Sequence, residues 1–256
     1  MMQLEICCGD LASVLAAKKG GAQRIELCSG LSEGGLTPSI GLIKAAVATG
    51  IPNINVLIRP RPGDFLYSTE ELSLMEDDIK TAISAGATGI VIGVLTPDGD
   101  IDMNACERLI KAARDEARSL GRESLNITFH RAFDVSRDAD KSLNDIILLG
   151  CDCLLTSGMA PTAVKGLPAL QRLSRVASGR ISIMAGSGVN PANARDIINA
   201  TEVDSIHSTA RKPIASRMLF RRPLVPMGAP GSDEYAPLST SPDVVAALIA
   251  AINDKQ

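Results

Sequence analysis

Short apolar runs rich in Val and Ile alternate with longer amphipathic stretches along the whole chain. Short runs bounded by polar turns are typical of buried strands, and the periodic stretches between them are typical of helices. The pattern predicts eight strands, at residues 4–7, 24–28, 55–59, 89–93, 126–130, 153–156, 181–185 and 204–207.

The stretches between these strands carry helix start and stop signals. Asp10 can cap a helix that ends at Gly20. Thr37, with Pro38 at the first helical position, predicts the start of another helix that ends at Gly50.

A third start signal has capping-box spacing. Ser68 precedes Glu71 by three residues, and the helix that they open is predicted to end near Gly86. The other predicted helices cover residues 102–120, 138–149, 163–177, 191–200 and 242–253.

Strands that alternate with helices are typical of βαβ units and a parallel sheet. An open doubly wound sheet uses the same alternation, but eight units in 256 residues match the usual size of a TIM (β/α)8 barrel. No stretch has the composition of an interdomain linker, so we expect one domain over residues 1–256. The alternation of strands and helices is interrupted at about 209–240. This segment is rich in proline, and we expect it to be an irregular lid, interface arm or mobile loop.

Composition narrows the classes of function. Hydrophobic residues make up 45% of the chain and aromatic residues only 2%, which predicts a large aliphatic core. A net charge of -3 with scattered basic residues argues against nucleic-acid binding. No apolar stretch reaches the ~20 residues that span a bilayer, and a signal-peptide pattern is missing, so we expect a cytoplasmic protein with no membrane partner. Its six cysteines should then remain thiols.

In a TIM barrel the working residues lie at the carboxyl ends of the strands. The first two predicted strands share a Glu-aliphatic-Cys pattern, whose period of two places each Glu and Cys on the inward face. Because neighbouring strands lie about 4.8 Å apart, Cys7 and Cys28 can present two thiols to one Cu(I) ion; the alternative is a pair of inert core thiols. The remaining cysteines have the character of packing residues: Cys8, Cys106, Cys151 and Cys153.

The third strand leads into the most distinctive stretch of the chain, R-P-R-P-G-D-F. Prolines restrain the backbone that carries Arg59 and Arg61, and the glycine permits a sharp turn before Asp64. Inward carboxylates are costly unless they are paired or solvated, so Glu5 and Glu26 are predicted site residues. Arg59 should point inward and either neutralise these carboxylates or bind an anionic ligand, with Arg61 and Asp64 as further ligand contacts.

Both histidines of the chain fall at the ends of predicted strands. His130 ends the fifth strand, beside Arg131 and Asp134, and His207 ends the eighth. Histidine is suited to proton transfer near neutral pH. His130 and Glu26 are therefore the candidate catalytic residues, with Arg131, Asp134 and His207 as substrate contacts; a structural role for His130 is the alternative.

The last three predicted strands end in small residues. Ser157 follows the sixth strand, Gly186 and Gly188 follow the seventh, and Ser208 follows the eighth. TIM barrels often bind phosphate with the loops after strands seven and eight, through backbone N–H groups at a helix start. These residues predict a phosphate cradle, with ordinary βα turns as the alternative.

The strand ends also carry a family resemblance. Its stretches are ELC at 26–28, GGLTPS at 34–39, IRPRPGDF at 58–65, TFHRAFD at 128–134, LTSG at 155–158, AGSG at 185–188 and HS at 207–208. In this order they resemble the CutC copper-homeostasis family over nearly the whole chain. The resemblance implies a cytoplasmic, homo-oligomeric TIM barrel with a role in copper tolerance or Cu(I) binding, and Cys7 and Cys28 match positions proposed as copper ligands in relatives.

Three functions are consistent with these residues. The first is a Cu(I)-binding homeostasis protein with Cys7 and Cys28 as ligands. The second is an enzyme of unknown reaction on a small anionic or phosphorylated metabolite, in which His130 or Glu26 transfers a proton. The third is a noncatalytic assembly protein whose segment 209–240 packs on a neighbouring subunit.

Overall fold

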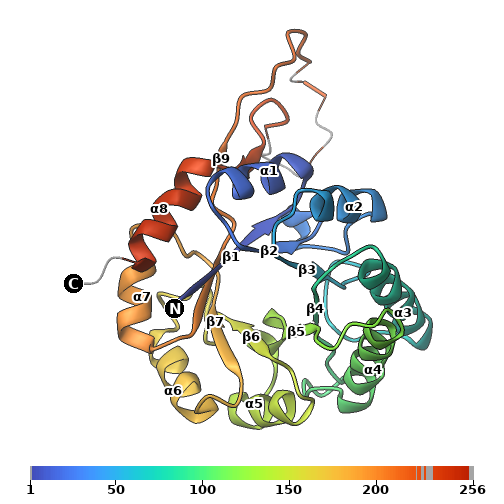
Figure 1. Cartoon of the computed structure of the whole chain (residues 1–256). Helices are drawn as coiled ribbons and strands as arrows, with labels where there is room; N and C mark the ends of the chain where they lie inside the picture. Colours follow the sequence, from blue (N-terminus) through green and yellow to red (C-terminus); the bar gives the residue numbers. More distant parts are fainter. Residues whose placement is uncertain (1, 223, 226–227, 229–232, 254–256) are drawn as a thin grey trace.

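A computed structural model describes residues 2–222, 224–225, 228 and 233–253. Eight parallel strands close into a barrel in chain order, and the eighth pairs back with the first (Figure 1). The strands are β1 Gln3–Cys8, β2 Arg24–Leu27, β3 Asn53–Leu57, β4 Gly89–Ile92, β5 Asn126–Phe129, β6 Cys153–Thr156, β7 Ser182–Ala185 and β8 Ser205–Ser208. Each lies within two residues of its predicted position, and the predicted TIM (β/α)8 barrel is confirmed.

Helices cover the outside of the barrel as a ring, in which α8 lies between α7 and α1 (Figure 1). They are α1 Leu11–Lys19, α2 Ile40–Ala48, α3 Thr69–Ser84, α4 Met103–Ser119, α5 Ala139–Leu148, α6 Leu167–Ala177, α7 Ala194–Thr201 and α8 Pro242–Asn253, with 3-10 turns η1 Leu31–Glu33 and η2 Arg131–Val135. Asp10 caps α1 as predicted, by accepting from the Ser13 N–H at 2.7 Å. Among the described residues, no helix has the length and apolar character needed to cross a bilayer.

The start of one helix differs from the prediction. The Ser68 and Glu71 capping box of α3 is present in full, but Ser39 caps α2 in place of Thr37, by accepting from the Leu42 N–H. Thr37 instead pairs with the residue that follows the third strand: its hydroxyl accepts from the Arg59 N–H, and its own N–H donates to the Arg59 carbonyl, each at 2.9 Å. A tertiary contact has therefore overridden a local capping signal.

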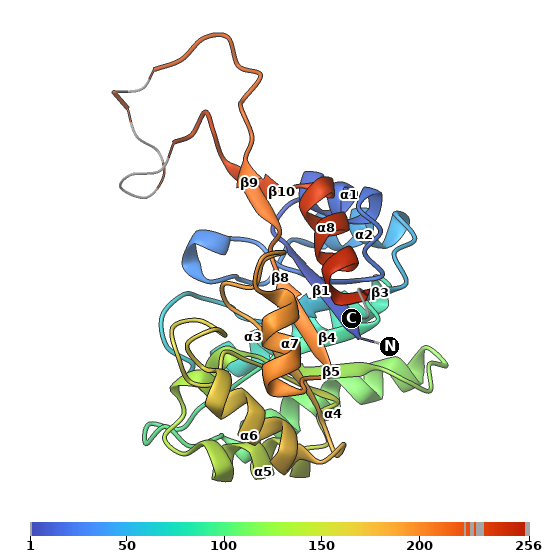
Figure 2. The ribbon, with the colours of Figure 1, turned by 90° about the vertical axis from the view of Figure 1, so that its left-hand side faces the viewer.

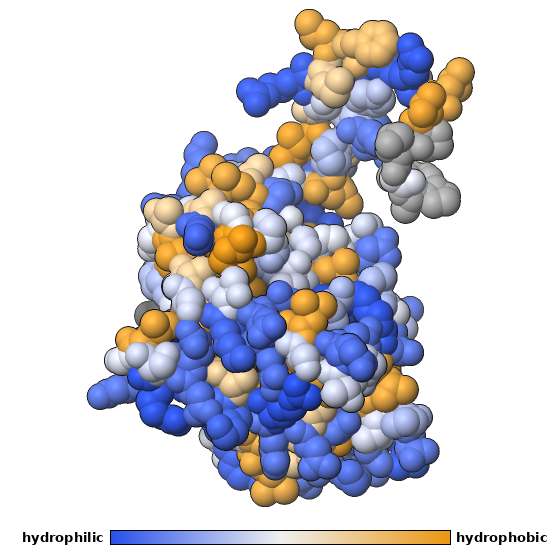
Figure 3. Space-filling view, turned by 90° about the vertical axis from the view of Figure 1, so that its right-hand side faces the viewer, coloured by the Kyte–Doolittle hydropathy of each residue, from blue (hydrophilic) through white to orange (hydrophobic). Residues whose placement is uncertain are grey.

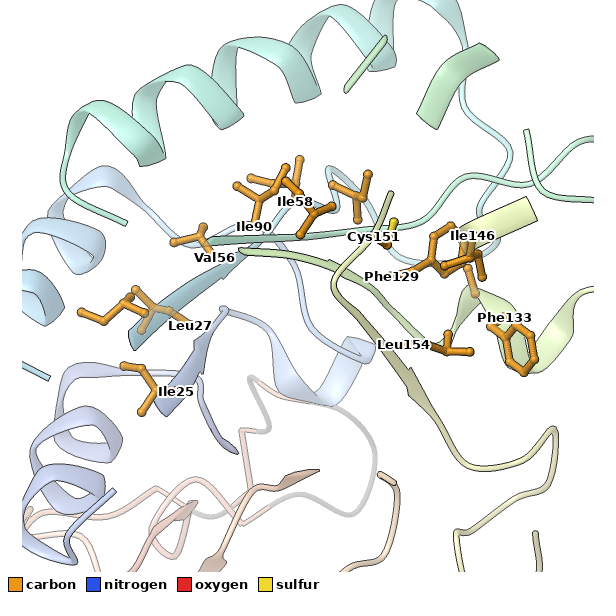
Figure 4. Close-up of a cluster of buried hydrophobic side chains, with 14 of the residues drawn as sticks. Ile25, Leu27, Val56, Ile58, Ile90, Phe129, Phe133, Ile146, Cys151 and Leu154 are labelled. Atoms are coloured by element: carbon orange, nitrogen blue, oxygen red, sulfur yellow. The ribbon is translucent and has the colours of Figure 1, made fainter. Parts of the chain in front are cut away.

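The apolar core is a sleeve between the strands and the helices (Figure 4). Outward-facing strand residues such as Ile25, Ile90 and Phe129 are fully buried there, together with helix residues such as Ile146. Burial of one such side chain stabilises the fold by about 1.5–3 kcal/mol. The sleeve is mostly aliphatic, as predicted, and it leaves the inside of the barrel free for polar groups.

Polar side chains fill much of the barrel interior. Ile6 points out into the sleeve, so its neighbours Glu5 and Cys7 point inward, and Glu26 and His207 are likewise buried inside. The prediction that the Glu-aliphatic-Cys strands turn their Glu and Cys residues inward is confirmed. The interior of this barrel is therefore chemically unlike the layers of branched aliphatic residues that usually fill a TIM barrel.

Beyond β8 the chain leaves the barrel as a long arm (Figure 2). It starts with β9 Arg211–Pro213 and returns through β10 Leu238–Thr240, which pair in antiparallel register. The segment predicted to be irregular at about 209–240 therefore begins and ends with a short strand, and these two strands supply each other's backbone partners. The arm stands clear of the barrel and carries apolar groups (Figure 3), and its exposed apolar side chains include Met218, Leu219, Phe220 and Leu224.

Candidate functional site

A cavity of about 520 Å³ opens at the carboxyl ends of the strands. Most of the predicted site residues line it: Cys7, Glu26, Arg59, His130, Arg131, Asp134, Gly188, His207 and Ser208. Others lie behind the wall or outside it: Glu5, Cys28, Arg61, Asp64, Ser157 and Gly186. Most residues that the sequence predicted for the site thus lie together at the barrel mouth, but several of them have contacts other than the predicted ones.

Two thiols meet at the floor of this cavity. The Sγ atoms of Cys7 and Cys28 lie 3.5 Å apart and share a hydrogen bond, and both cysteines are free and buried. Cys7 lines the cavity, and Cys28 lies directly behind it. The hydrogen bond with Cys28, together with burial, raises the pKa of the Cys7 thiol well above its ordinary value. The adjacency of the two thiols that the sequence predicted is present in the structure.

An imidazole and a carboxylate complete a cluster around Cys7. Single ligand atoms of Cys7, Glu26 and His207 all lie within 4.8 Å of one another. The Nε2 atom of His207 is 3.7 Å from a Glu26 oxygen, and its Nδ1 atom is 2.9 Å from a Glu5 oxygen. A metal-binding histidine is commonly held by a carboxylate on its other nitrogen, and Glu5 has that position here.

The charges inside the cluster perturb one another. Burial raises the pKa of Glu26, although nearby His207 opposes the shift. Burial lowers the pKa of His207, but Glu26 and Glu5 outweigh it and the net pKa is raised. Both shifts favour the protonated forms of Glu26 and His207 relative to the same groups in water.

Glu5 lies beneath the cavity and is fully paired within the barrel. Arg24 donates its Nε–H to one Glu5 oxygen at 2.6 Å, and Asn55 donates to the same oxygen at 2.8 Å. Burial opposes ionisation, but Arg24, His207 and Asn55 outweigh it and lower the pKa of Glu5 to about 2. Glu5 thus positions His207 and does not reach the cavity as a substrate contact. The sequence reasoning missed Arg24, although it shares the inward face of its strand with Glu26.

Arg59 does not neutralise the inward carboxylates. Its Nη1 donates to the carbonyls of Glu33 and Gly35, at 2.8 and 2.9 Å, and its Nη2 donates to the carbonyl of Gly63 at 2.8 Å. It therefore joins the loops after β2 and β3. Its Nε–H is buried and has no hydrogen-bond partner among the described residues.

Arg61 and Asp64 face away from the cavity, against the prediction that they contact the ligand. Arg61 donates its Nε–H to Glu71 at 2.6 Å and an Nη2–H to the Leu66 carbonyl at 2.6 Å, and it pairs with Asp64 at 3.1 Å. The Asp64 side chain is 73% exposed. The Arg-Pro-Arg-Pro turn separates the two guanidinium groups, so only the first of them lies at the cavity.

His130 is held in a single orientation. Its Nδ1 accepts the Ala132 N–H at 3.2 Å, so the hydrogen of the neutral ring is on Nε2. Burial and the positive charge of Arg59 lower the pKa of His130 to about 3. The imidazole is therefore neutral at physiological pH and suited to donate a hydrogen bond through Nε2.

Asp134 organises the loop after β6 and leaves no oxygen free for a substrate. It accepts from the hydroxyl and N–H of Ser157, the hydroxyl of Thr156, the N–H of Met159 and the Nε–H of Arg131. Ser157 is completely buried. Ser157 does not line the cavity and instead holds the loop after β6 through Asp134.

The predicted phosphate cradle is only partly formed. Gly186 allows close packing, since a Cβ there would lie 2.6 Å from Leu155, and it does not line the cavity. The Ser208 hydroxyl donates to the Val189 carbonyl at 2.7 Å and accepts the Ala210 N–H. Gly188, at φ 75°, does line the cavity. The sequence offered no signal for Arg211, which enters the cavity from the first position of β9.

The fold and the site define a TIM-barrel protein with two thiols, an imidazole and a carboxylate clustered at the carboxyl mouth of the barrel. The family model of the CutC family matches residues 2–212. The chain belongs to the CutC family. The matched range ends within β9, so the outer part of the arm lies beyond it.

Individual relatives support this assignment. The chain is 45% identical to a CutC family protein of Chromobacterium violaceum over 252 residues, which cover 98% of each sequence. It is 43% identical to a CutC family protein of Vibrio campbellii over 98% of this chain and 99% of the relative. The crystal structure of CutC from Streptococcus agalactiae is similar with a TM-score of 0.74 and 34% identity, over 82% of this chain and 99% of that one.

Proposed function

We propose that this protein binds Cu(I) through Cys7 and Cys28 and acts in copper homeostasis. The observation that carries the proposal is the 3.5 Å contact between two free thiols at the floor of the cavity. The Streptococcus agalactiae relative is named for copper homeostasis, which supports the same assignment. The reducing cytoplasm is the compartment in which such a thiol pair stays available.

The chemistry of the ligands favours a soft ion. Thiolates select Cu(I) over hard cations such as Mg²⁺ or Ca²⁺, and imidazole is a further ligand for copper. His207 Nε2 lies in the same cluster as Cys7, with its ring held by Glu5. We infer that the two sulfurs bind Cu(I) and that His207 provides a third ligand. Both thiols give up their protons to solvent when the ion binds, because thiolates are the ligands of Cu(I).

A competition titration tests this function. Metal-free, reduced protein would be titrated against a coloured Cu(I) chelator, and the expected result is transfer of one equivalent of Cu(I) to the protein. The Cys7→Ser/Cys28→Ser variant should lose this binding, because hydroxyl groups are poor ligands for a soft ion.

The matched control removes two buried thiols from elsewhere. Cys106 and Cys151 belong to the sleeve between strands and helices, so Cys106→Ala/Cys151→Ala should keep the Cu(I) affinity of the parent. Equal affinities in the parent and the Cys7→Ser/Cys28→Ser variant, with both proteins folded by circular dichroism, would overturn the proposal.

A further inference from the structure

Three N–H groups along the wall of the cavity are buried without a hydrogen-bond partner among the described residues. They are Nε of Arg59, Nε2 of His130 and Nε of Arg211. Arg59 is 7% exposed and His130 is 5% exposed. A buried donor with no acceptor costs free energy, so native proteins rarely keep one unless a water, an ion or a ligand satisfies it.

Two of these donors cannot turn to another acceptor. The remaining arms of the Arg59 guanidinium are fixed by backbone carbonyls, including those of Gly35 and Gly63. The His130 ring is fixed by the Ala132 N–H on Nδ1, which leaves Nε2 as the donor. The protein therefore holds both groups in place and leaves their hydrogens unused.

Phe65 brings these two donors into one part of the wall. Its ring centroid lies 5.0 Å from that of His130, and the Arg59 Cζ atom lies 5.1 Å from the same Phe65 centroid. Phe65 is only half-buried, and it comes from the turn after β3 that Arg59 fixes. The Phe65 ring therefore packs beside both donor-bearing side chains.

The cavity is much larger than a metal ion requires. At about 520 Å³ it falls within the range of small-molecule sites, and Leu57, Leu155 and Val189 give it apolar walls. The oxygens of Asp134 are already taken by the loop after β6. Unused donors and positive charge together favour an occupant that carries acceptor oxygens.

We propose that this cavity binds a small organic anion, whose carboxylate or phosphate group accepts hydrogen bonds from Arg59, His130 and Arg211 beside the thiol pair. The site goes beyond Cu(I) binding and does not depend on it. Charge-assisted hydrogen bonds from two guanidinium groups are the kind that proteins use to fix such anions. The neutral His130 ring adds a donor without requiring a proton to be taken up.

Isothermal titration calorimetry on metal-free protein tests the proposal. The probes are inorganic phosphate, glycerol 3-phosphate and succinate, with glycerol as the uncharged control. We expect saturable binding of at least one anion and none of glycerol. A preference for glycerol 3-phosphate over succinate would assign the site to phosphate esters, and the reverse would assign it to carboxylates.

Two variants and a neighbouring control define the site. In His130→Asn the Asn Oδ1 can still accept the Ala132 N–H, but the donor at Nε2 is lost, and Arg211→Met removes the second charge. Each should weaken anion binding about tenfold or more. Lys212→Met removes a charge one residue away, from a side chain that pairs with Asp243 outside the cavity, and should leave the affinity unchanged.

The outcomes separate this site from the copper site. Cu(I) binding and anion binding are measured separately on the parent protein, so a failure of Cu(I) binding leaves this proposal standing. Absence of saturable binding by all three anions overturns it. Binding that is equally strong in the parent, His130→Asn and Arg211→Met overturns it as well.

Discussion

Replacing His130 by Asn tests whether this imidazole is neutral in the folded protein. Its pKa is lowered from the ordinary 6.5 to about 3 by burial and by Arg59. In the unfolded chain the ring takes up a proton as the pH falls below 6.5, whereas in the folded protein it stays neutral until about pH 3. The stability that depends on neutral His130 is therefore complete above pH 6.5 and is lost progressively toward pH 3.

The expected size of the effect follows from these pKa values. Between pH 6.5 and pH 5 the unfolded state gains about 1.4 kcal/mol per pH unit over the folded state, or about 2 kcal/mol in total. His130→Asn lacks this contribution, but it keeps the other titrating groups of the protein. The difference in unfolding free energy between parent and variant should therefore shift by about 2 kcal/mol in favour of the variant on going from pH 7 to pH 5.

Urea unfolding of both proteins at pH 7, 6 and 5, followed by circular dichroism, measures this shift. Glu107→Gln, an exposed substitution on α4, serves as the control whose difference from the parent should stay constant over the same range. If the gap between parent and His130→Asn changes by less than about 0.5 kcal/mol, His130 titrates in the folded protein as it does in water, and its description as a neutral donor is wrong.

Three further predictions concern other parts of the molecule. We expect the arm to hold copies of the chain together, because Leu219 and Phe220 are 100% and 67% exposed on it. The Leu219→Ser/Phe220→Ser variant should therefore self-associate less in sedimentation velocity, while its unfolding free energy changes by less than about 0.5 kcal/mol. An unchanged sedimentation coefficient contradicts this prediction. All six thiols are buried, so Ellman's reagent should react slowly with the native protein and titrate six thiols in urea; rapid reaction in the native state would show that the floor of the cavity is open. Gly89→Ala would place a Cβ 2.2 Å from the Asn55 Oδ1 and 2.7 Å from the Asn126 carbonyl oxygen. It should therefore destabilise the barrel by about 1–3 kcal/mol in urea unfolding. An unchanged urea concentration at the midpoint of unfolding would contradict this prediction.

The barrel could be predicted from the sequence because its signals are local. Apolar runs mark the strands, and cap residues such as Asp10 and Ser68 mark helix starts within a few positions. Local signals mispredict the role of Thr37. Thr37 has the sequence pattern of a helix cap, but in the fold its hydroxyl accepts from the Arg59 N–H. Arg59 is distant along the chain, so no local pattern reveals this competing contact.

The inward direction of the site residues was also predictable, because a period of two fixes which face a strand residue occupies. Their partners were not. Arg59 was expected to neutralise the inward carboxylates or to bind an anion. In the fold, loop carbonyls accept most of its donors, and Arg24 pairs with Glu5 instead. Long side chains choose partners according to three-dimensional distance, which the spacing of residues in one strand does not determine. For the same reason Arg211 reaches the cavity without any signal in the sequence.

Cys7, Glu26 and His207 all lie on barrel strands, and this position determines which surrounding residues can change without moving them. Cys7 and Glu26 lie on β1 and β2 as paired residues of the barrel ladder, and His207 is paired with Glu5 across β8 and β1. Insertions or deletions in the surrounding loops leave those pairings intact, because the register is fixed by backbone bonds inside the barrel. The proposed copper ligands and the proposed anion site can thus vary independently, because substitution of a loop residue such as Phe65 leaves the strand positions of Cys7 and His207 unchanged.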